Sequence, residues 1–143
     1  MRVRELMTGG LITVRRETSV QGARDLMTRE QIRHLPVLDP GGALVGVVTD
    51  RDIRLNLPSP ATGLSEQEIG YLLDRLTVGQ SLTQSVIMVG PDRQGREAAQ
   101  LMLEHRIGAV PVVDDGRLIG ILTETDIVRA FIRVTAPLRG VHR

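Results

Sequence analysis

The sequence contains no cysteine and no tryptophan, and Tyr71 and Phe131 are its only tyrosine and phenylalanine. Without cysteine, disulfides, thiolate nucleophiles and cysteine-ligated zinc are excluded. The shortage of aromatic side chains removes the stacking platforms on which recognition of single-stranded nucleic acid depends. Any base bound by this protein would therefore lie between aliphatic side chains.

An excess of charge of one sign and long apolar runs are also lacking. The 18 basic and 17 acidic side chains give a net charge of +1 over 143 residues, so no broad electrostatic footprint for nucleic acid or an anionic membrane is expected. No run reaches the roughly 18 apolar residues of a membrane span, and the first residues form no apolar signal core. These absences predict a cytoplasmic protein that binds neither nucleic acid nor membrane.

The sequence does contain a long duplication. The segment IRHLPV at positions 32–37 returns as IGAVPV at positions 107–112, and each copy is followed by the pattern G-x-x-T-x-x-D. The spacing of about 75 residues exceeds the periods of about 20–50 that mark solenoids and propellers. The second copy is one residue shorter in the glycine-rich turn, where a change of length is tolerated best. Two copies of this length predict two domains that face one another.

Hydrophobic periodicity and turn residues predict the order β-α-β-β-α in each copy. In the first copy, the helix after the first strand is capped by Thr18 or Ser19. The predicted elements of the first copy are strands 11–14, 34–38 and 43–48, a helix after Ser19 and a helix from residue 50. Those of the second copy are strands 85–89, 109–113 and 118–122 and helices 96–104 and 125–133. The predicted fold class is α/β (α+β), with two repeats packed about a pseudo-two-fold axis.

The predicted boundaries are a first repeat at 1–55, a linker at 56–77, a second repeat at 78–133 and a tail at 134–143. Two prolines and a glycine oppose regular structure over residues 56–63. Ser65 and Glu68 then form a capping-box pattern, which predicts a short helix over about 66–76. Its apolar stripe packs either on the repeats or on a second subunit. The tail carries arginines and helix breakers and is expected to be disordered or solvated.

The repeated h-P-V strand and the G-h-h-T-x-x-D turn resemble the CBS domain, and two copies in tandem resemble a Bateman module. The connector segments RDIRL (51–55) and PSPAT (58–62) are similar to the acetoin-utilisation type of stand-alone bacterial or archaeal CBS protein. The resemblance implies two clefts between the repeats that hold adenosine compounds such as AMP, ADP, ATP or S-adenosylmethionine, with NAD as a further candidate. It also implies a homodimer and no required cofactor.

The repeated turns are candidate ligand contacts. Asp52 and Asp126 can accept hydrogen bonds from ribose hydroxyls, while Thr49 and Thr123 can donate to phosphate beside the free amides of a helix N-terminus. The same spacing is that of an ordinary helix capping box, and one turn can serve both roles.

Basic side chains distinguish the two copies. Arg33 and His34 precede the first h-P-V strand, where family members often place groups that touch phosphate, whereas the second copy has Gly108 and Ala109. The first cleft is therefore expected to bind phosphate better. A surface salt bridge for Arg33 and an ordinary strand position for His34 are the alternatives.

A base slot completes the predicted sites, although most of its residues are also core candidates. Met88 replaces the hydroxyl of Thr13 by a thioether, which puts the second site in more doubt. The further predicted ligand-binding residues are Val14, Ile32, Leu35, Pro36 and Arg51 in the first copy and Ile107, Ala109, Val110 and Pro111 in the second.

No nucleophile motif, P-loop or metal-binding cluster is visible, so we expect no enzymatic activity and no resident metal. The leading hypothesis is a regulatory module that senses an adenosine ligand and acts on an unidentified partner protein. The alternative is a structural or oligomerising pair of repeats without a physiological nucleotide. A third possibility is metal or polyphosphate binding by Asp50 and Glu124, with magnesium brought by ATP. Gly95, which replaces Val20 near a helix start, has no functional explanation from the sequence.

Overall fold

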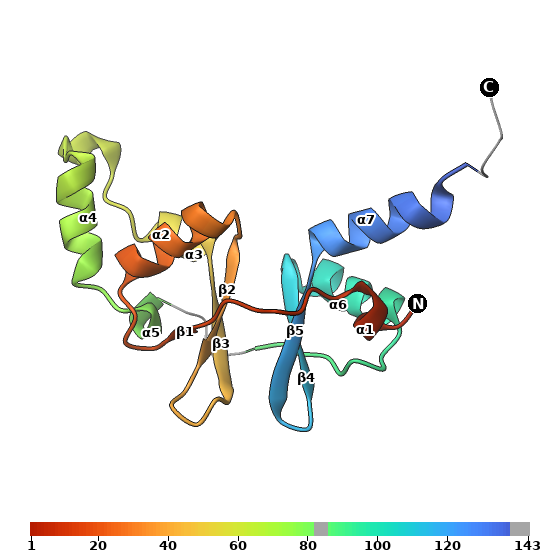
Figure 1. Ribbon diagram of the computed structural model, residues 1–143. Helices are drawn as coiled ribbons and strands as arrows, with labels where there is room; N and C mark the ends of the chain where they lie inside the picture. Colours follow the sequence, from red (N-terminus) through yellow and green to blue (C-terminus); the bar gives the residue numbers. More distant parts are fainter. Residues whose placement is uncertain (82–85, 138–143) are drawn as a thin grey trace. The chain divides into compact units, whose positions relative to one another are not determined.

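The computed structural model describes residues 1–81 and 86–137. The chain forms two compact units (Figure 1). Unit 1 comprises Met1–Leu11 and Ile87–Arg143, and unit 2 comprises Ile12–Val86. Each unit contains an antiparallel hairpin packed against helices. The predicted α+β class is therefore confirmed.

Unit 2 is built on a three-stranded sheet in the order β1-β2-β3. The strands are β1 (Val14–Arg15), β2 (His34–Leu38) and β3 (Leu44–Thr49), and β1 runs parallel to β2 while β3 runs antiparallel to it. The first strand is shorter and lies later than the predicted 11–14, because only Val14 and Arg15 pair with β2. Helices α2 (Val20–Glu30) and α3 (Asp50–Leu55) pack with the sheet around an apolar core.

Unit 1 repeats this plan with α6 (Gly95–His105), β4 (Ala109–Asp114), β5 (Arg117–Thr123) and α7 (Glu124–Thr135). Val89 forms a parallel bridge with Val112, as Val14 does with Val37 in unit 2. This single bridge takes the place of the strand predicted at 85–89, and Ser85 lies outside the described residues. The duplication in sequence is thus a duplication in backbone pairing.

The hairpin turns explain where the copies differ in length. In the second copy, Asp115 and Gly116 have φ values of 50° and 77° and join β4 to β5. Two central residues with positive φ are what a two-residue type I′ turn requires, and Asp-Gly is a preferred pair for it. The first copy uses a longer loop in which Asp39 Oδ1 accepts from the Ala43 amide at 2.9 Å.

Local capping signals position most helix starts. Ser19, and not Thr18, caps α2, because its Oγ accepts from the Gly22 amide at 2.9 Å. Helix α7 continues through Val134 and Thr135, so the predicted tail begins later than residue 134. The remainder of that tail, 138–143, lies outside the described residues.

The linker forms the short 3-10 helix η1 (Pro60–Thr62) and the predicted helix, α4 (Glu66–Asp74). Ser65 and Glu68 make the expected capping box, with Ser65 Oγ accepting from the Glu68 amide at 3.1 Å. Leu73 on α4 is 1% exposed and belongs to the core of unit 2. Ile69, Leu73 and Leu76 of the stripe therefore pack within unit 2, where α4 lies against α2, whereas Leu72 is 42% exposed.

The start of each copy packs on the other copy, α1 on α6, α7 and β5 and α5 on α2. Helix α1 (Val3–Leu6) belongs to unit 1, where the Val3 amide donates to the Arg93 carbonyl at 2.9 Å. Helix α5 (Val78–Ser81) belongs to unit 2, where the Val78 amide donates to the Thr18 carbonyl at 2.7 Å. Neither short helix was predicted. The structural units therefore exchange the leading segments of the sequence repeats 1–55 and 78–133.

The exchanged helix α1 packs closely on Gly95 and forms an exposed ion pair with Asp92. A Cβ on Gly95 would lie 2.4 Å from Leu6 Cδ1 and 3.2 Å from the Met1 carbonyl oxygen, so glycine allows α1 to approach α6 closely. Arg4 also lies 2.7 Å from Asp92, and its hydrogen bond holds the pKa of the Asp92 carboxyl below its ordinary value.

Candidate ligand-binding site

Both repeated turns are helix capping boxes. In unit 2 the Thr49 amide donates to Asp52 Oδ2 at 2.8 Å, and the Asp52 amide donates to Thr49 Oγ1 at 3.1 Å. In unit 1 the corresponding distances for Thr123 and Asp126 are 2.9 and 3.3 Å. The capping interpretation is confirmed for both turns. A carboxylate offers about four acceptor positions, so a capping role leaves capacity for a ligand.

Asp126 has a more enclosed position than an ordinary cap. It is 7% exposed, and its Oδ1 accepts a hydrogen bond from Thr8 Oγ1 at 3.0 Å. Its Oδ2 accepts a hydrogen bond from Thr123 Oγ1 at 3.1 Å. Thr8 comes from the leading segment that unit 1 receives by exchange. Burying a carboxylate is costly unless it is hydrogen-bonded, so these contacts stabilise the charge at this position.

A pocket of about 530 Å³ opens beside Asp126 between α1 and α7. It is lined by Glu5, Leu6, Met7, Thr8, Asp126, Arg129, Ile132 and Arg133. Arg129 and Arg133 follow Asp126 by three and seven residues, which places all three on one side of α7. Within the described residues neither arginine forms an ion pair. The pocket therefore combines an acceptor with two cationic donors.

The sequence pattern did not indicate these arginines, because the second copy has Gly108 and Ala109 where the first copy has its basic groups. The aligned position in the first copy is Leu55 for Arg129, so the repeat itself gave no signal. The spacing of both arginines from Asp126 on a predicted helix was the available clue.

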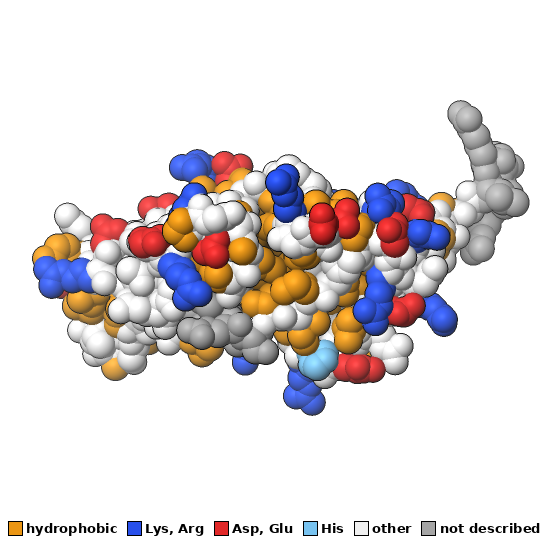
Figure 2. Space-filling model, turned by 90° about the horizontal axis from the view of Figure 1, so that it is seen from below, with side chains coloured by type: hydrophobic (Ala, Val, Ile, Leu, Met, Phe, Trp, Pro, Cys, Tyr) orange, Lys and Arg blue, Asp and Glu red, His pale blue; other side chains and the backbone are white. Residues whose placement is uncertain are grey.

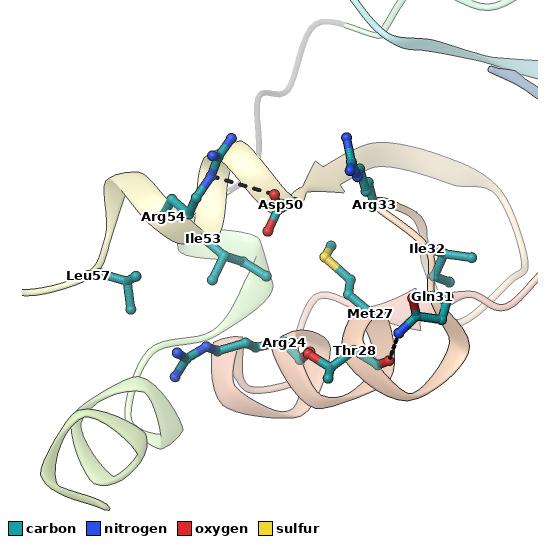
Figure 3. Close-up of a pocket in the computed structure, with 10 residues that line it drawn as sticks. All are labelled: Arg24, Met27, Thr28, Gln31, Ile32, Arg33, Asp50, Ile53, Arg54 and Leu57. Carbon is teal, nitrogen blue, oxygen red and sulfur yellow. Dashed lines mark hydrogen bonds and ion pairs between the residues drawn. The ribbon is translucent and has the colours of Figure 1, made fainter. Parts of the chain in front are cut away.

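A second pocket, of about 410 Å³, lies in unit 2 between α2, α3 and the start of β2 (Figure 3). It is lined by Arg24, Met27, Thr28, Gln31, Ile32, Arg33, Asp50, Ile53, Arg54 and Leu57. Met27 and Ile53 are 6% and 2% exposed and form apolar walls. The pocket brings the predicted contacts Ile32 and Arg33 together, whereas Asp52 and Thr49 are not part of its lining.

The guanidinium groups around this second pocket differ in their pairing. Arg54 lies 3.5 Å from Asp50, and Arg24 lies 3.4 Å from Glu66 on α4. Arg33 is exposed and forms no ion pair among the residues that the structure describes, so the salt-bridge alternative for Arg33 finds no support there. All 18 basic side chains of the chain are arginine, whose planar donors suit phosphate.

The other predicted ligand contacts fall into three groups. Fully buried core side chains are Leu35, Pro36, Val110 and Pro111, and Val14 and Ala109 are also buried. Exposed side chains are Thr13, Arg51 and Met88, and half-buried ones are His34 and Ile107. Their contacts with a ligand stay predictions, and the buried group has a packing role in either case.

No cluster of three metal-ligating side chains occurs within residues 1–81 and 86–137. Asp50 is paired with Arg54, and Glu124 is exposed at the start of α7. None of the helices in these ranges is both long and apolar enough to cross a membrane. On the face drawn in Figure 2, acidic and basic side chains are interspersed, without a broad area of one sign.

The two hairpin-and-helix units and their T-x-x-D turns define a tandem CBS pair. The CBS domain family matches residues 3–59 and 78–133, and the chain belongs to this family. The predicted membership of the CBS domain family is therefore confirmed.

Particular relatives extend this assignment. A CBS domain-containing protein of Dictyostelium discoideum is 33% identical over 137 residues, covering 95% of this chain and 94% of the relative. The structure of AcuB from Vibrio cholerae, named for acetoin utilization, has a TM-score of 0.76 at 30% identity and covers 94% of this chain and 92% of its own.

A structure of CBSX2 in complex with AMP has a TM-score of 0.77 at 35% identity, with 93% and 97% of the two chains covered. The CBSX2 sequence from Arabidopsis thaliana is 34% identical, and the matched region spans 60% of it. A CBS domain pair in complex with 5′-methylthioadenosine and S-adenosyl-L-methionine matches with a TM-score of 0.75 at 30% identity, covering 92% of this chain and 99% of that one. Adenosine compounds are thus bound by similar CBS pairs.

Some similar proteins carry enzyme names. A homoserine O-acetyltransferase of Methanococcoides burtonii is 36% identical over 128 residues, but the match spans only 23% of that longer protein. The shared part is the CBS pair, and CBS domains are generally regulatory.

Proposed function

We propose that this protein is a regulatory module that binds an adenosine nucleotide, AMP, ADP or ATP. The observation that carries the proposal is the unit 1 pocket, where the buried carboxylate of Asp126 lies on the same side of α7 as Arg129 and Arg133. An adenosine nucleotide needs an acceptor for its ribose hydroxyls, cationic donors for its phosphate and apolar walls for its base. The pocket contains all three.

The ribose, the phosphate and the base of the nucleotide would each have a partner in this pocket. Asp126 Oδ1 accepts one hydrogen bond from Thr8 and has a further lone pair for a ribose hydroxyl. Arg129 and Arg133 donate to phosphate in a planar, charge-assisted geometry. Leu6, Met7 and Ile132 supply the aliphatic surface that a base requires in a chain with so few aromatic side chains.

The formal charges of the pocket balance, because its lining contains Glu5 and Asp126 as well as Arg129 and Arg133. The two guanidinium groups still offer charge-assisted donors to a phosphate, so we expect nucleotides to bind more tightly than adenosine. In unit 2, Arg33 offers a second phosphate contact beside the apolar walls formed by Met27, Ile32 and Ile53. The two pockets carry their arginines on different elements, so their affinities differ.

Calorimetric titration with AMP, ADP, ATP, S-adenosylmethionine, NAD and adenosine tests the proposal. The double variant Arg129→Gln/Arg133→Gln should weaken AMP binding at the unit 1 site by about 10- to 100-fold, since a hydrogen bond to a charged group contributes about 1.5–3 kcal/mol. Adenosine, which lacks phosphate, should be little affected. Arg96→Gln, an exposed arginine on α6 outside the pocket, is the matched control.

The remaining variants separate the sites. Arg33→Gln should weaken a second binding event and leave the first unchanged, while Asp126→Asn should weaken adenosine as well as AMP. Loss of AMP binding in the Arg96 control to the same extent as in the double variant would refute the assigned phosphate contacts. Absence of heat and of any thermal shift with all six compounds would refute nucleotide sensing.

A structural role through protein contacts is the second candidate, and α7 favours it. Phe131, Val128, Ile132 and Val134 are between 56% and 65% exposed on this helix. A row of large apolar side chains in solvent is typical of an interaction surface. Under this alternative, Phe131→Ser would change association without changing nucleotide affinity.

A further inference from the structure

The two pockets differ in the balance of their charges. The lining of the unit 2 pocket contains three guanidinium groups, those of Arg24, Arg33 and Arg54, and the carboxylate of Asp50. Three positive charges against one negative charge leave an excess of two positive charges. The unit 1 pocket has two arginines and two carboxylates, so its charges balance. The unit 2 pocket is therefore the cationic one.

The guanidinium groups reach this pocket from three separate elements (Figure 3). Arg24 comes from α2, Arg54 comes from α3, and Arg33 directly precedes β2. The buried side chains of Met27 and Ile53 form apolar walls between them. Apolar surroundings strengthen an electrostatic contact, because they lower the local dielectric constant. The pocket therefore suits an anion that carries charge at several points.

The ion pairs already present at this pocket are loose. The Arg24 and Glu66 groups lie 3.4 Å apart. The Arg54 and Asp50 groups lie 3.5 Å apart, whereas charge-assisted hydrogen bonds have distances of about 2.7–2.9 Å. Both carboxylates are open to water, with the Glu66 side chain 79% and the Asp50 side chain 47% exposed. Exposed pairs contribute little to stability, so both arginines can exchange their carboxylates for a better acceptor.

The unit 2 pocket lacks the groups expected to recognise a ribose, because Thr49 and Asp52 are not part of its lining. Its capacity for phosphate therefore does not require a nucleoside. Orthophosphate has too few oxygens to pair with three guanidinium groups in the two-point geometry that arginine favours, whereas each further phosphoryl group adds terminal oxygens. The number of guanidinium groups thus favours a chain of phosphates over a single phosphate.

We propose that the unit 2 pocket binds an oligophosphate chain through Arg24, Arg33 and Arg54. Arg33 forms no ion pair in the part of the chain that the structure describes, so it is ready to bind the ligand, and Arg24 leaves Glu66 as the ligand enters. The volume of about 410 Å³ lies within the range of about 300–1,000 Å³ that is typical of ligand pockets. Because no adenosine is needed, this site goes beyond the proposed function and does not depend on it.

Calorimetric titration of the full chain with pyrophosphate, tripolyphosphate and orthophosphate, in buffer without divalent cations, tests the proposal. The two oligophosphates should bind about tenfold or more tighter than orthophosphate, because they engage more guanidinium groups. Arg33→Gln and Arg24→Gln should each weaken pyrophosphate binding by about tenfold or more. Glu66→Gln frees Arg24 from its competing partner and should tighten pyrophosphate binding by about two- to fivefold.

Two further variants locate the site. Arg29→Gln removes an exposed arginine of α2 that lies outside the pocket lining, and it is the matched control for Arg24→Gln. The double variant Arg129→Gln/Arg133→Gln removes the arginines of the unit 1 pocket. Both proteins should bind pyrophosphate as wild type does. Thermal unfolding in buffer without phosphate checks that every variant remains folded.

Tight binding of both oligophosphates that depends on Arg24 and Arg33 would support the proposal. Binding no tighter than that of orthophosphate, an equal loss in Arg29→Gln and Arg24→Gln, or no tightening in Glu66→Gln would each overturn it. Loss of pyrophosphate binding in the unit 1 double variant would overturn it as well.

Titration with ATP identifies the source of the chain. Tripolyphosphate should bind about as tightly as ATP at this pocket, and a pocket that takes ATP but neither inorganic anion would overturn the proposal. Nucleotide binding at unit 1 is measured separately, so a failure of either site leaves the other standing.

Discussion

The exchange of the N-terminal segment into unit 1 can be tested at Gly120, where β5 meets that segment. A Cβ added at Gly120 would lie 2.6 Å from Met7 Sδ, 3.1 Å from Met7 Cγ and 3.0 Å from the Thr8 carbonyl oxygen. The methionine side chain can rotate away, but the backbone oxygen is held by the Ile121 amide, which donates to it at 3.0 Å. Gly120→Ala should therefore separate the segment from β5.

The expected loss combines two opposing terms. Overpacking a well-filled site costs about 1–3 kcal/mol, and replacing glycine by alanine returns about 0.4–1 kcal/mol by restricting the unfolded chain. Together the two ranges give a fall of about 0–2.6 kcal/mol in the free energy of unfolding, and their midpoints give a fall of about 1.3 kcal/mol. Met7→Ala removes two of the three close atoms, so the double variant Met7→Ala/Gly120→Ala should lose less than the sum of the two single losses.

Urea unfolding measures the free energies, and hydrogen exchange measures the local opening. The amides of Thr8 and Ile121 bond each other's carbonyls at 2.9 and 3.0 Å, so both should exchange faster in Gly120→Ala. Gly90→Ala is the control, since a Cβ there meets nothing within 4 Å and its φ is not positive. A Gly120→Ala protein as stable as wild type, with unchanged exchange at both amides, would refute the close approach.

Three further predictions concern single side chains. Leu73→Ala should lower the free energy of unfolding by about 2–5 kcal/mol in urea, because Leu73 anchors α4 in the core; a loss below half the lower figure would contradict this packing. Thr8→Val should cost about 1.5–3 kcal/mol by removing the hydrogen bond to buried Asp126, and an unchanged unfolding midpoint would show that the bond is unimportant. The hydrogen bond from Arg4 lowers the folded-state pKa of Asp92 below its unfolded value, so its contribution is present at neutral pH and lost as pH falls through the folded-state pKa. The difference in unfolding midpoint between wild type and Asp92→Asn should therefore disappear in acid; a difference that persists or grows there would contradict the sign.

Local signals account for the parts of the fold that were predicted. The capping boxes at Thr49, Ser65 and Thr123 link residues three apart, and the hairpins join neighbouring strands through short turns. Interactions over so few residues depend on the identity of those residues alone. Even there the ends shifted: β1 is shorter than predicted and α7 is longer, because strand pairing and packing decide where an element stops.

The candidate sites were predicted less completely, for a physical reason. The sequence pointed to Asp126 and Arg33 through their repeated or basic positions, and both line pockets. It did not point to Thr8, whose hydroxyl reaches Asp126 across 118 positions of sequence. It also did not point to Arg129 and Arg133, because the first copy has no equivalent cations there.

By itself the sequence determined the duplication, the α+β class, the hairpins and the helix starts. Hydrophobic periodicity and helix capping depend only on residues a few positions apart, so they can be recognised from the sequence. Only the tertiary structure decided that Met1–Leu11 belongs with the second copy and α5 with the first. Helices of four residues have no stability of their own. They form because residues far away in the sequence supply backbone hydrogen bonds and apolar packing for them. The same long-range packing joins Thr8 to α7 and so builds the pocket that the repeat pattern could not show.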